Sequence, residues 1–314
     1  LIGSYLYIEK DKINKNTSFS WLGFILLAIG AGSLQIVLDR GQIEDWFYSN
    51  FIVILTILSL VTLLSFVFLF FINKKTLFPK ELFLDSNYLG GLVFIFLFGI
   101  MLVPPFILIP EFLSTLGNYP VDQIGILLTF SGIGGMLGTL LAGRVISKGF
   151  HKTLMATGLL IYMLGAFQMV TWNSSVSSYE IIINGLLRGA GIGSFYVGLA
   201  TATYASLPQK LRNHGASLFQ FIRNFGSAFS VAIIAIVLDR YKKINISELS
   251  SRINSSQSQG KLDTWNLDGL DANTLEFIQV ITQESLMISL LNTFFLLAII
   301  PIAFFPFLLL FKKV

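Results

Sequence analysis

Long apolar blocks separated by short polar segments dominate the amino-acid sequence. Each block has about 18 residues or more with almost no charge, the length that a helix needs to cross the hydrocarbon core of a bilayer. Such a block must be helical, because within a membrane every backbone polar group has to be satisfied inside the segment. The pattern predicts an all-α membrane protein with about eight transmembrane helices, at residues 20–38, 51–72, 88–110, 124–141, 153–170, 181–207, 217–238 and 285–311.

Composition agrees with this pattern and excludes several classes of function. Hydrophobic residues make up 54% of the 314 residues and charged residues only 12%, about half the charged share of a soluble domain. The absence of cysteine excludes disulfides, thiolate metal sites and cysteine nucleophiles. His151 and His214 lie in polar connections without metal-ligand spacing, so we expect neither a metal nor a cofactor. The net charge of +4 is spread between spans, which does not favour nucleic-acid binding.

Basic residues gather in the connections on one side of the spans. Short cytoplasmic connections carry an excess of Lys and Arg, whereas the short connections on the opposite side carry only Arg40. We therefore expect both ends of this chain to be cytoplasmic, and the even number of spans agrees because it returns the chain to its starting side. The basic residues on this side are Lys10, Lys12, Lys15, Lys74, Lys75, Lys80, Arg144, Lys148, Lys152, Lys210, Arg212, Lys312 and Lys313.

The connection at residues 240–284 is longer than the others and is rich in Ser, Asn and Gln. We predict an outer loop here, in which residues 265–283 have enough apolar positions for a short surface helix. Asn245-Ile246-Ser247 matches the glycosylation acceptor pattern. Chance explains this match better, because Asn and Ser are abundant in the segment.

Two arginine residues lie inside predicted spans, Arg188 in the sixth and Arg223 in the seventh. An Arg at the centre of a membrane helix costs roughly 2.5–3.5 kcal/mol on insertion scales, so such residues usually face a water-filled cavity or a partner. The alternative is that the side chain extends to a nearby interface, an interpretation that fits Arg223 better because it is closer to the cytoplasmic end. Asn184 shares a helical face with Arg188, four residues earlier.

The seventh span carries a polar stripe at helical spacing. Its positions fall on one face at roughly 100° per residue, while the rest of the helix is almost entirely Phe, Ile, Val and Ala. We interpret the stripe as the wall of a wet interior. The alternative is a face that only joins helices through hydrogen bonds. The stripe consists of Gln220, Arg223, Asn224, Ser227 and Ser230.

Glycines at four-residue spacing predict close helix packing. Gly185, Gly189 and Gly193 line up in the sixth span, and Gly134 and Gly138 repeat the spacing in the fourth. Small residues at this spacing let two membrane helices approach closely. A nucleotide-binding loop is the weaker interpretation, because the G-x-G-x-x-G order after a strand is missing.

The third span carries Pro104, Pro105 and Pro110, followed by Glu111. Paired prolines remove hydrogen-bond donors from a helix, so this span should kink or unwind. Shielding from water would let Glu111 exchange protons. The alternative is an ordinary carboxylate at the membrane interface.

Taken together and in order, these motifs resemble the major facilitator superfamily, and most closely its fourteen-span drug:proton antiporters of the EmrB/QacA type. The resemblance covers nearly the whole chain. The motifs that carry it are Leu38-Asp39-Arg40-Gly41-Gln42 with Asp45-Trp46-Phe47, Gly138-Thr139-Leu140-Leu141-Ala142-Gly143-Arg144 with Lys148 and Lys152, Leu187-Arg188-Gly189-Ala190-Gly191-Ile192-Gly193, Ala205-Ser206-Leu207-Pro208, and Gly215-Ala216-Ser217-Leu218 with Arg223-Asn224-Phe225-Gly226-Ser227.

The resemblance implies how the chain is organised. Residues 1–17 would be a cytoplasmic segment with the end of a missing preceding helix, and residues 18–80 the family's two extra central helices. Residues 81–314 would form the C-terminal six-helix bundle of two inverted three-helix repeats, with the outer loop 240–284. The sequence starts at Leu1, and we expect it to lack the N-terminal six-helix bundle.

The family's basic cytoplasmic loop is similar to this chain at Gly143, Arg144, Lys148 and Lys152. The resemblance implies that this loop takes part in gating. The chain departs from the family pattern at one place, because Ser147 stands where an Asp usually pairs with charges near helix ends. Gly149 also stands one place early.

The resemblance implies a multidrug efflux transporter of the inner (plasma) membrane, which exports small amphipathic or cationic compounds in exchange for protons. The residues expected along the substrate and proton pathway are Asn184, Arg188, Gln220, Arg223, Asn224 and Glu111. The main proton-carrying acid is expected in the missing N-terminal bundle. The partners implied are the substrate, protons, the lipid bilayer and that bundle.

Three alternatives remain beside drug efflux. A major facilitator exporter of another cargo, such as a lipid, siderophore or sugar, fits the same motifs. A membrane-embedded enzyme built on Ser194 would need a histidine within reach, and both histidines lie in connections, so we expect no enzyme. A pure anchor protein does not explain the polar stripe.

Overall fold

The computed structural model describes residues 19–73, 76–257 and 272–308, and in these residues it contains helices and no strand. Eight helical segments are long and apolar enough to cross a membrane, which confirms the predicted fold class and number of spans. The longer elements are α2 (Trp21–Arg40), α3 (Asn50–Ile72), α4 (Ser86–Leu102), α5 (Pro104–Thr115), α6 (Val121–Ile146), α7 (His151–Val170), α8 (Ser178–Ala205), α9 (Gln209–Gln257) and α10 (Ala272–Ile299). Short turns of helix are η1 (Trp46–Tyr48), η2 (Lys80–Leu84), η4 (Ile300–Phe304) and α11 (Phe305–Leu308).

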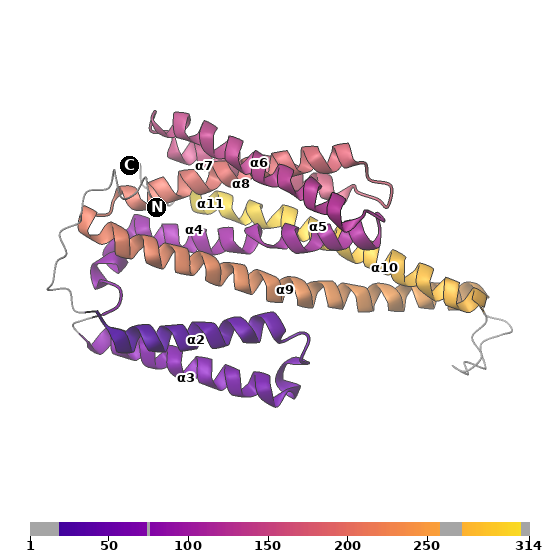
Figure 1. The fold of residues 1–314 in the computed structure, drawn as a ribbon, viewed down its shortest axis with the longest axis horizontal. Coiled ribbons are helices and arrows are strands. Elements are labelled where there is room, and N and C mark those ends of the chain that lie inside the picture. The colour runs from indigo at the N-terminus through magenta and orange to yellow at the C-terminus, as the bar shows by residue number, and fades with distance from the viewer. Residues whose placement is uncertain (1–18, 74–75, 258–271, 309–314) are drawn as a thin grey trace.

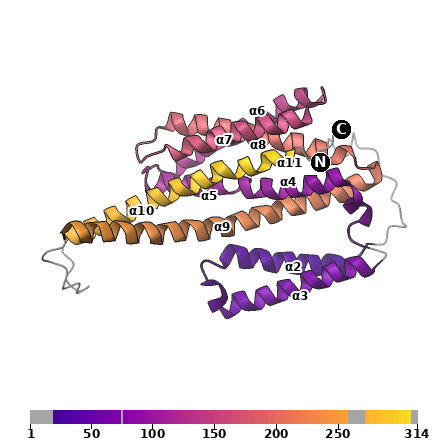
Figure 2. The same cartoon turned by 180° about the vertical axis from the view of Figure 1, so that it is seen from behind.

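The helices run side by side as a bundle made of α4 to α11, with α2 and α3 as a separate pair at one edge (Figures 1 and 2). Within the bundle α8 packs against α6 and α7, while α9 packs against α4 and α10. The pair α2 and α3 contact each other closely and reach the bundle through α9. Large apolar side chains of α3 such as Ile54, Leu64 and Phe68 are exposed, as expected of a helix that faces lipid.

Close packing between α6 and α8 follows the glycine pattern. A Cβ atom added at Gly189 would collide with the carbonyl oxygen of Ser131, and one added at Gly138 would collide with that of Ala190. Gly134 meets the backbone of Leu186 in the same way. These contacts confirm the prediction that small residues let the two helices approach each other.

The third span is broken, as its paired prolines predict. Helix α4 ends at Leu102 and α5 begins at Pro104, and Val103 between them forms a bend with a φ of −80° and a ψ of −39°. Neither Pro104 nor Pro105 has an N–H to continue the hydrogen-bond ladder. The amide of Phe106 donates to the carbonyl oxygen of Val103 at 2.9 Å and starts the new helix.

The described part of the segment 240–284, which we predicted as an outer loop, is helical and extends the helices on both sides of it. Helix α9 has 49 residues and continues to Gln257, and α10 begins at Ala272. At 1.5 Å per residue α9 is about 70 Å long, more than twice the hydrocarbon thickness. Figure 1 shows α9 and α10 extending together beyond the other helices. Residues 258–271 and the predicted segment 1–17 lie outside the described residues.

Polar contacts accompany α9 beyond the predicted span 217–238. Lys243 forms an ion pair with Asp239 one turn earlier on α9, at 2.7 Å. Asn245 donates to Ser289 Oγ of α10 at 2.9 Å and is buried. A buried Asn engaged in this way is no glycosylation acceptor in the folded chain, which supports chance as the origin of the Asn245-Ile246-Ser247 match.

Candidate functional site

A cavity of about 380 Å³ opens between the broken span and helices α6, α8 and α9. Its volume falls within the usual range of small-molecule sites, and its walls are mainly apolar and aromatic, as such sites usually are. The lining residues are Phe98, Leu102, Phe106, Leu128, Thr129, Ser131, Gly132, Gly135, Thr139, Gly189, Ile192, Gly193, Tyr196 and Arg223.

Arg223 is the one charged residue in this lining. Its guanidinium lies 6.0 Å from the centre of the Tyr196 ring, within the range of a cation–π contact. The side-chain oxygen of Gln220 accepts from Arg223 Nε at 3.2 Å when its amide is oriented to satisfy both groups, and Asn224 Oδ1 lies 3.5 Å from Nη2. Among the described residues no carboxylate lies within 4.0 Å of Arg223, so its positive charge faces the cavity without a counter-ion.

Close contact between α4 and α9 sets the position of Arg223. Gly99 of α4 lies against the backbone of Arg223, and Gly226 lies against the backbone of Phe96. Ser227 Oγ donates toward the carbonyl oxygens of Gly99 at 3.3 Å and Arg223 at 3.1 Å. These glycines allow the two backbones to touch, which places Arg223 at the edge of the cavity beside Phe98.

The polar stripe of the seventh span therefore serves two purposes along its length. Arg223 lines the cavity, Gln220 holds the guanidinium, and Asn224 is exposed next to it. Further along, Ser227 and Ser230 donate to backbone carbonyl oxygens. Of these bonds, the one from Ser227 to Gly99 joins α9 to α4 and fits a helix-joining face, while the interpretation as the wall of a wet interior stays a prediction.

Arg188 and Asn184 lie away from this cavity lining. Arg188 is only 3% exposed, and its Nε donates to Asn184 Oδ1 at 2.8 Å. Asn184 in turn donates to the carbonyl oxygen of Gly165 on α7 at 2.6 Å. This buried chain of hydrogen bonds joins α8 to α7.

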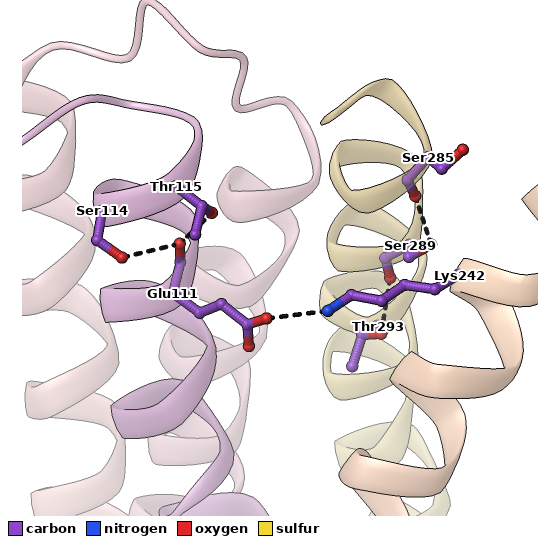
Figure 3. Close-up of polar contacts among 7 residues, drawn as sticks. All are labelled: Glu111, Ser114, Thr115, Lys242, Ser285, Ser289 and Thr293. Atoms are coloured by element: carbon purple, nitrogen blue, oxygen red, sulfur yellow. Dashed lines mark hydrogen bonds and ion pairs between the residues drawn. The ribbon is translucent and has the colours of Figure 1, made fainter. Parts of the chain in front are cut away.

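Glu111 forms an ion pair with Lys242 of α9 at 3.2 Å, and both side chains are about one-third exposed (Figure 3). Ser285, Ser289 and Thr293 of α10 lie beside the pair in the same view. The pair joins the second half of the broken span to α9 where that helix leaves its apolar segment. Sequence reasoning missed Lys242, because 131 residues separate it from Glu111.

The proposed gating residues lie where α6 turns into α7. Gly143 and Arg144 end α6, Lys148 lies in the turn, and Lys152 starts α7. Gly149 has a φ of +80°, a conformation that only glycine adopts readily. Arg144 and Lys148 are exposed, and this turn lies at the same end of the bundle as the connections that carry Lys80 and Lys210 (Figure 1).

Sequence reasoning also missed the aromatic side chains of the cavity, Phe98, Phe106 and Tyr196. A signal for Tyr196 exists, because it continues the face of Gly189 and Gly193 at helical spacing. In the described part of the chain no cluster of three or more His, Asp or Glu residues could hold a metal ion.

Comparison with known proteins gives three findings. Residues 89–242 match the Major Facilitator Superfamily. The multidrug export protein EmrB of Haemophilus influenzae is 26% identical over 282 residues, which cover 88% of this chain and 55% of that protein. The fatty acid resistance protein FarB of Neisseria gonorrhoeae is 24% identical and covers 78% of this chain and 48% of that protein. The chain thus spans about half the length of the curated relatives it matches.

The fold is similar to a solved transporter structure. A bacterial homologue of the human lysosomal transporter Spinster, in an inward-facing and unoccupied conformation, superposes with a TM-score of 0.52 at 14% identity. The match covers 91% of this chain and 68% of that one. The family match, the relatives and the shared fold agree in their likeness, and this chain is similar to the transporters of the major facilitator superfamily.

Proposed function

We propose that this chain is the C-terminal half of a multidrug efflux transporter of the inner membrane, with both of its ends in the cytoplasm. The observation that supports the proposal is the apolar and aromatic cavity with Arg223 at its edge, whose guanidinium has no carboxylate partner among the described residues. An apolar tail would lie against Phe98, Phe106 and Tyr196, and a polar head group would meet Arg223. The names of relatives such as EmrB support export of drug-like compounds.

The proposed intact protein has an N-terminal six-helix bundle that closes the other side of the cavity. In this arrangement α4 to α11 form the C-terminal bundle, and α2 and α3 are the two extra central helices. Transport would proceed by alternating access, in which the two bundles rock around the cavity. Export in exchange for protons would use an acid of the N-terminal bundle.

The other predicted residues take proposed roles from where they lie. Arg188 and Asn184 would hold α7 and α8 together as the bundle moves, and a direct role for Arg188 in the proton pathway remains a proposal. The ion pair of Glu111 with Lys242 would open if Glu111 took up a proton. The turn with Arg144 and Lys148 would approach the N-terminal bundle when the cytoplasmic side closes.

The proposed function is tested with the intact protein in proteoliposomes. An imposed proton gradient should drive export of a lipophilic dye, and cells that lack other efflux pumps should tolerate more drug when they produce the protein. Dye export that is absent with the gradient in either direction, together with unchanged drug tolerance, contradicts the proposal.

A second candidate is export of a lipid-like acid. The cavity lining has a cation and no carboxylate, and the relative FarB is named for fatty acid resistance. Export of a fluorescent fatty acid without export of cationic dyes in the same proteoliposomes would favour this candidate over general drug efflux.

A further inference from the structure

The break between α4 and α5 leaves a backbone carbonyl without its helical donor. In a continuous helix the N–H of residue 105 would donate to the carbonyl oxygen of Met101, four residues earlier. Pro105 has no N–H, and Met101 is only 1% exposed. Because an unsatisfied buried carbonyl is unfavourable, the missing hydrogen bond has to come from another part of the fold.

Tyr162 of α7 supplies this hydrogen bond. Its hydroxyl donates to the carbonyl oxygen of Met101 at 3.1 Å. The Tyr162 side chain is itself only 1% exposed, so the hydroxyl is held in a dry environment. A hydrogen bond between two buried groups is hard to replace with water, which makes this contact a firm link between α7 and the broken span.

Helix α7 is anchored to α8 at the same level. Gly191 of α8 lies against the backbone of Tyr162. One turn further along α7, the carbonyl oxygen of Gly165 accepts from Asn184, which also accepts from Arg188. The hydroxyl of Tyr162 therefore projects from a pair of helices that are fixed to each other.

Residues on both sides of the break between α4 and α5 line the cavity. Phe98 and Leu102 line the cavity from α4, and Phe106 lines it from α5. The angle between α4 and α5 therefore determines the position of Phe106 relative to Phe98 and Leu102. A change at the break would alter the cavity without any change in the lining residues.

We propose that Tyr162 is a positioning residue of the transport cycle. Its hydroxyl donates a hydrogen bond to the carbonyl oxygen of Met101, which has no helical donor because residue 105 is a proline. This hydrogen bond sets the angle between α4 and α5. This inference rests on the proposed transport function, since a positioned cavity wall serves a protein that moves a substrate. It assigns a role to a tyrosine outside the cavity lining and outside the polar stripe.

The test is a double-mutant cycle of Tyr162→Phe and Pro105→Ala in the intact protein. An alanine at position 105 gives Met101 a backbone donor again, so the hydroxyl of Tyr162 becomes redundant. In the parent protein Y162F should lower the melting temperature in detergent by about 2–4 °C. It should also lower the maximal export rate several-fold at an unchanged half-saturating substrate concentration. In the P105A background Y162F should shift the melting temperature by less than half as much.

Tyr88→Phe is the matched control. Tyr88 is a buried tyrosine whose hydroxyl also donates to a backbone carbonyl, that of Gly215 at 2.8 Å. Its effect on the melting temperature should be equal in the parent and P105A backgrounds, because Pro105 has no part in that bond.

Two results would overturn the inference. One is an equal melting shift for Y162F in both backgrounds, which would mean that the hydroxyl does not serve the carbonyl freed by Pro105. The other is a change confined to the half-saturating concentration, which would indicate a substrate contact. A parent protein that exports nothing contradicts the proposed function alone, because the melting cycle still measures the hydrogen bond.

Discussion

Replacing Gly189 with alanine is expected to prevent normal assembly of the bundle. The added Cβ would collide with the carbonyl oxygen of Ser131 and would lie 2.7 Å from the backbone nitrogen of Gly135. Backbone atoms cannot rotate out of the way, so α6 and α8 would have to separate. Overpacking typically costs about 1–3 kcal/mol, a large share of the stability of a protein. Most of the purified protein should therefore aggregate or elute as unfolded material in gel filtration.

Gly125→Ala is the matched control for this substitution. Gly125 lies on the same helix as Gly135, and nothing lies within 4 Å of an added Cβ at that position. This variant should purify with the yield of the parent protein. Equal yield and equal melting temperature for G189A and G125A would show that α6 and α8 do not pack through this glycine.

The second large effect is expected at Arg223, where glutamine should lower export of compounds with an acidic head group by at least about 10-fold. A hydrogen bond to a charged group contributes about 1.5–3 kcal/mol, and 1.4 kcal/mol corresponds to a factor of ten in binding. Arg223 faces the cavity without a carboxylate partner among the described residues. Its charge is therefore free to meet the substrate. Export of the labelled compound from proteoliposomes measures the effect.

Two further variants test whether export depends on a positive charge at residue 223 or only on the net charge of the protein. Arg223→Lys keeps the positive charge but lacks the planar set of N–H donors of the guanidinium, so this variant should retain part of the export activity. Lys210→Gln removes one positive charge at an exposed position at the start of the same helix, outside the cavity lining, and should leave export unchanged. Equal losses for R223Q and K210Q would mean that net charge, and not a cavity contact, explains the effect.

The positions of the spans could be predicted from the sequence, because the length and apolarity of a segment are local properties. Close packing at the two glycine rows could also be predicted, because small residues at this spacing let another helix approach, whereas only the structure shows that α6 and α8 are the partners. The length of α9 could not be predicted from the sequence. Its polar continuation is stabilised by contacts with α10, such as Asn245 with Ser289, and these contacts join segments far apart in the chain.

The site was only partly predictable for the same reason. Arg188 and Arg223 have similar sequence surroundings, because each lies in an apolar helix with an Asn within one turn, and the sequence separates them only by the distance of each from the end of its span. Only the arrangement of neighbouring helices distinguishes them, with Arg188 enclosed between α7 and α8 and Arg223 at the cavity. The break at Pro104 and Pro105 was expected, whereas its partner Tyr162 lies on a different helix.

The central claim is that the cavity side of α6 is wet while the opposite side of this helix faces lipid. The chain has no cysteine, so single cysteines can be introduced at Thr139, which lines the cavity, and at Leu141, which is exposed outside its lining. At about 100° per residue these neighbours on α6 point in nearly opposite directions. A small charged thiol reagent, applied to the intact protein in membranes, should react with T139C and not with L141C, and an exported compound should slow the reaction at T139C. Faster reaction at L141C than at T139C would contradict the account.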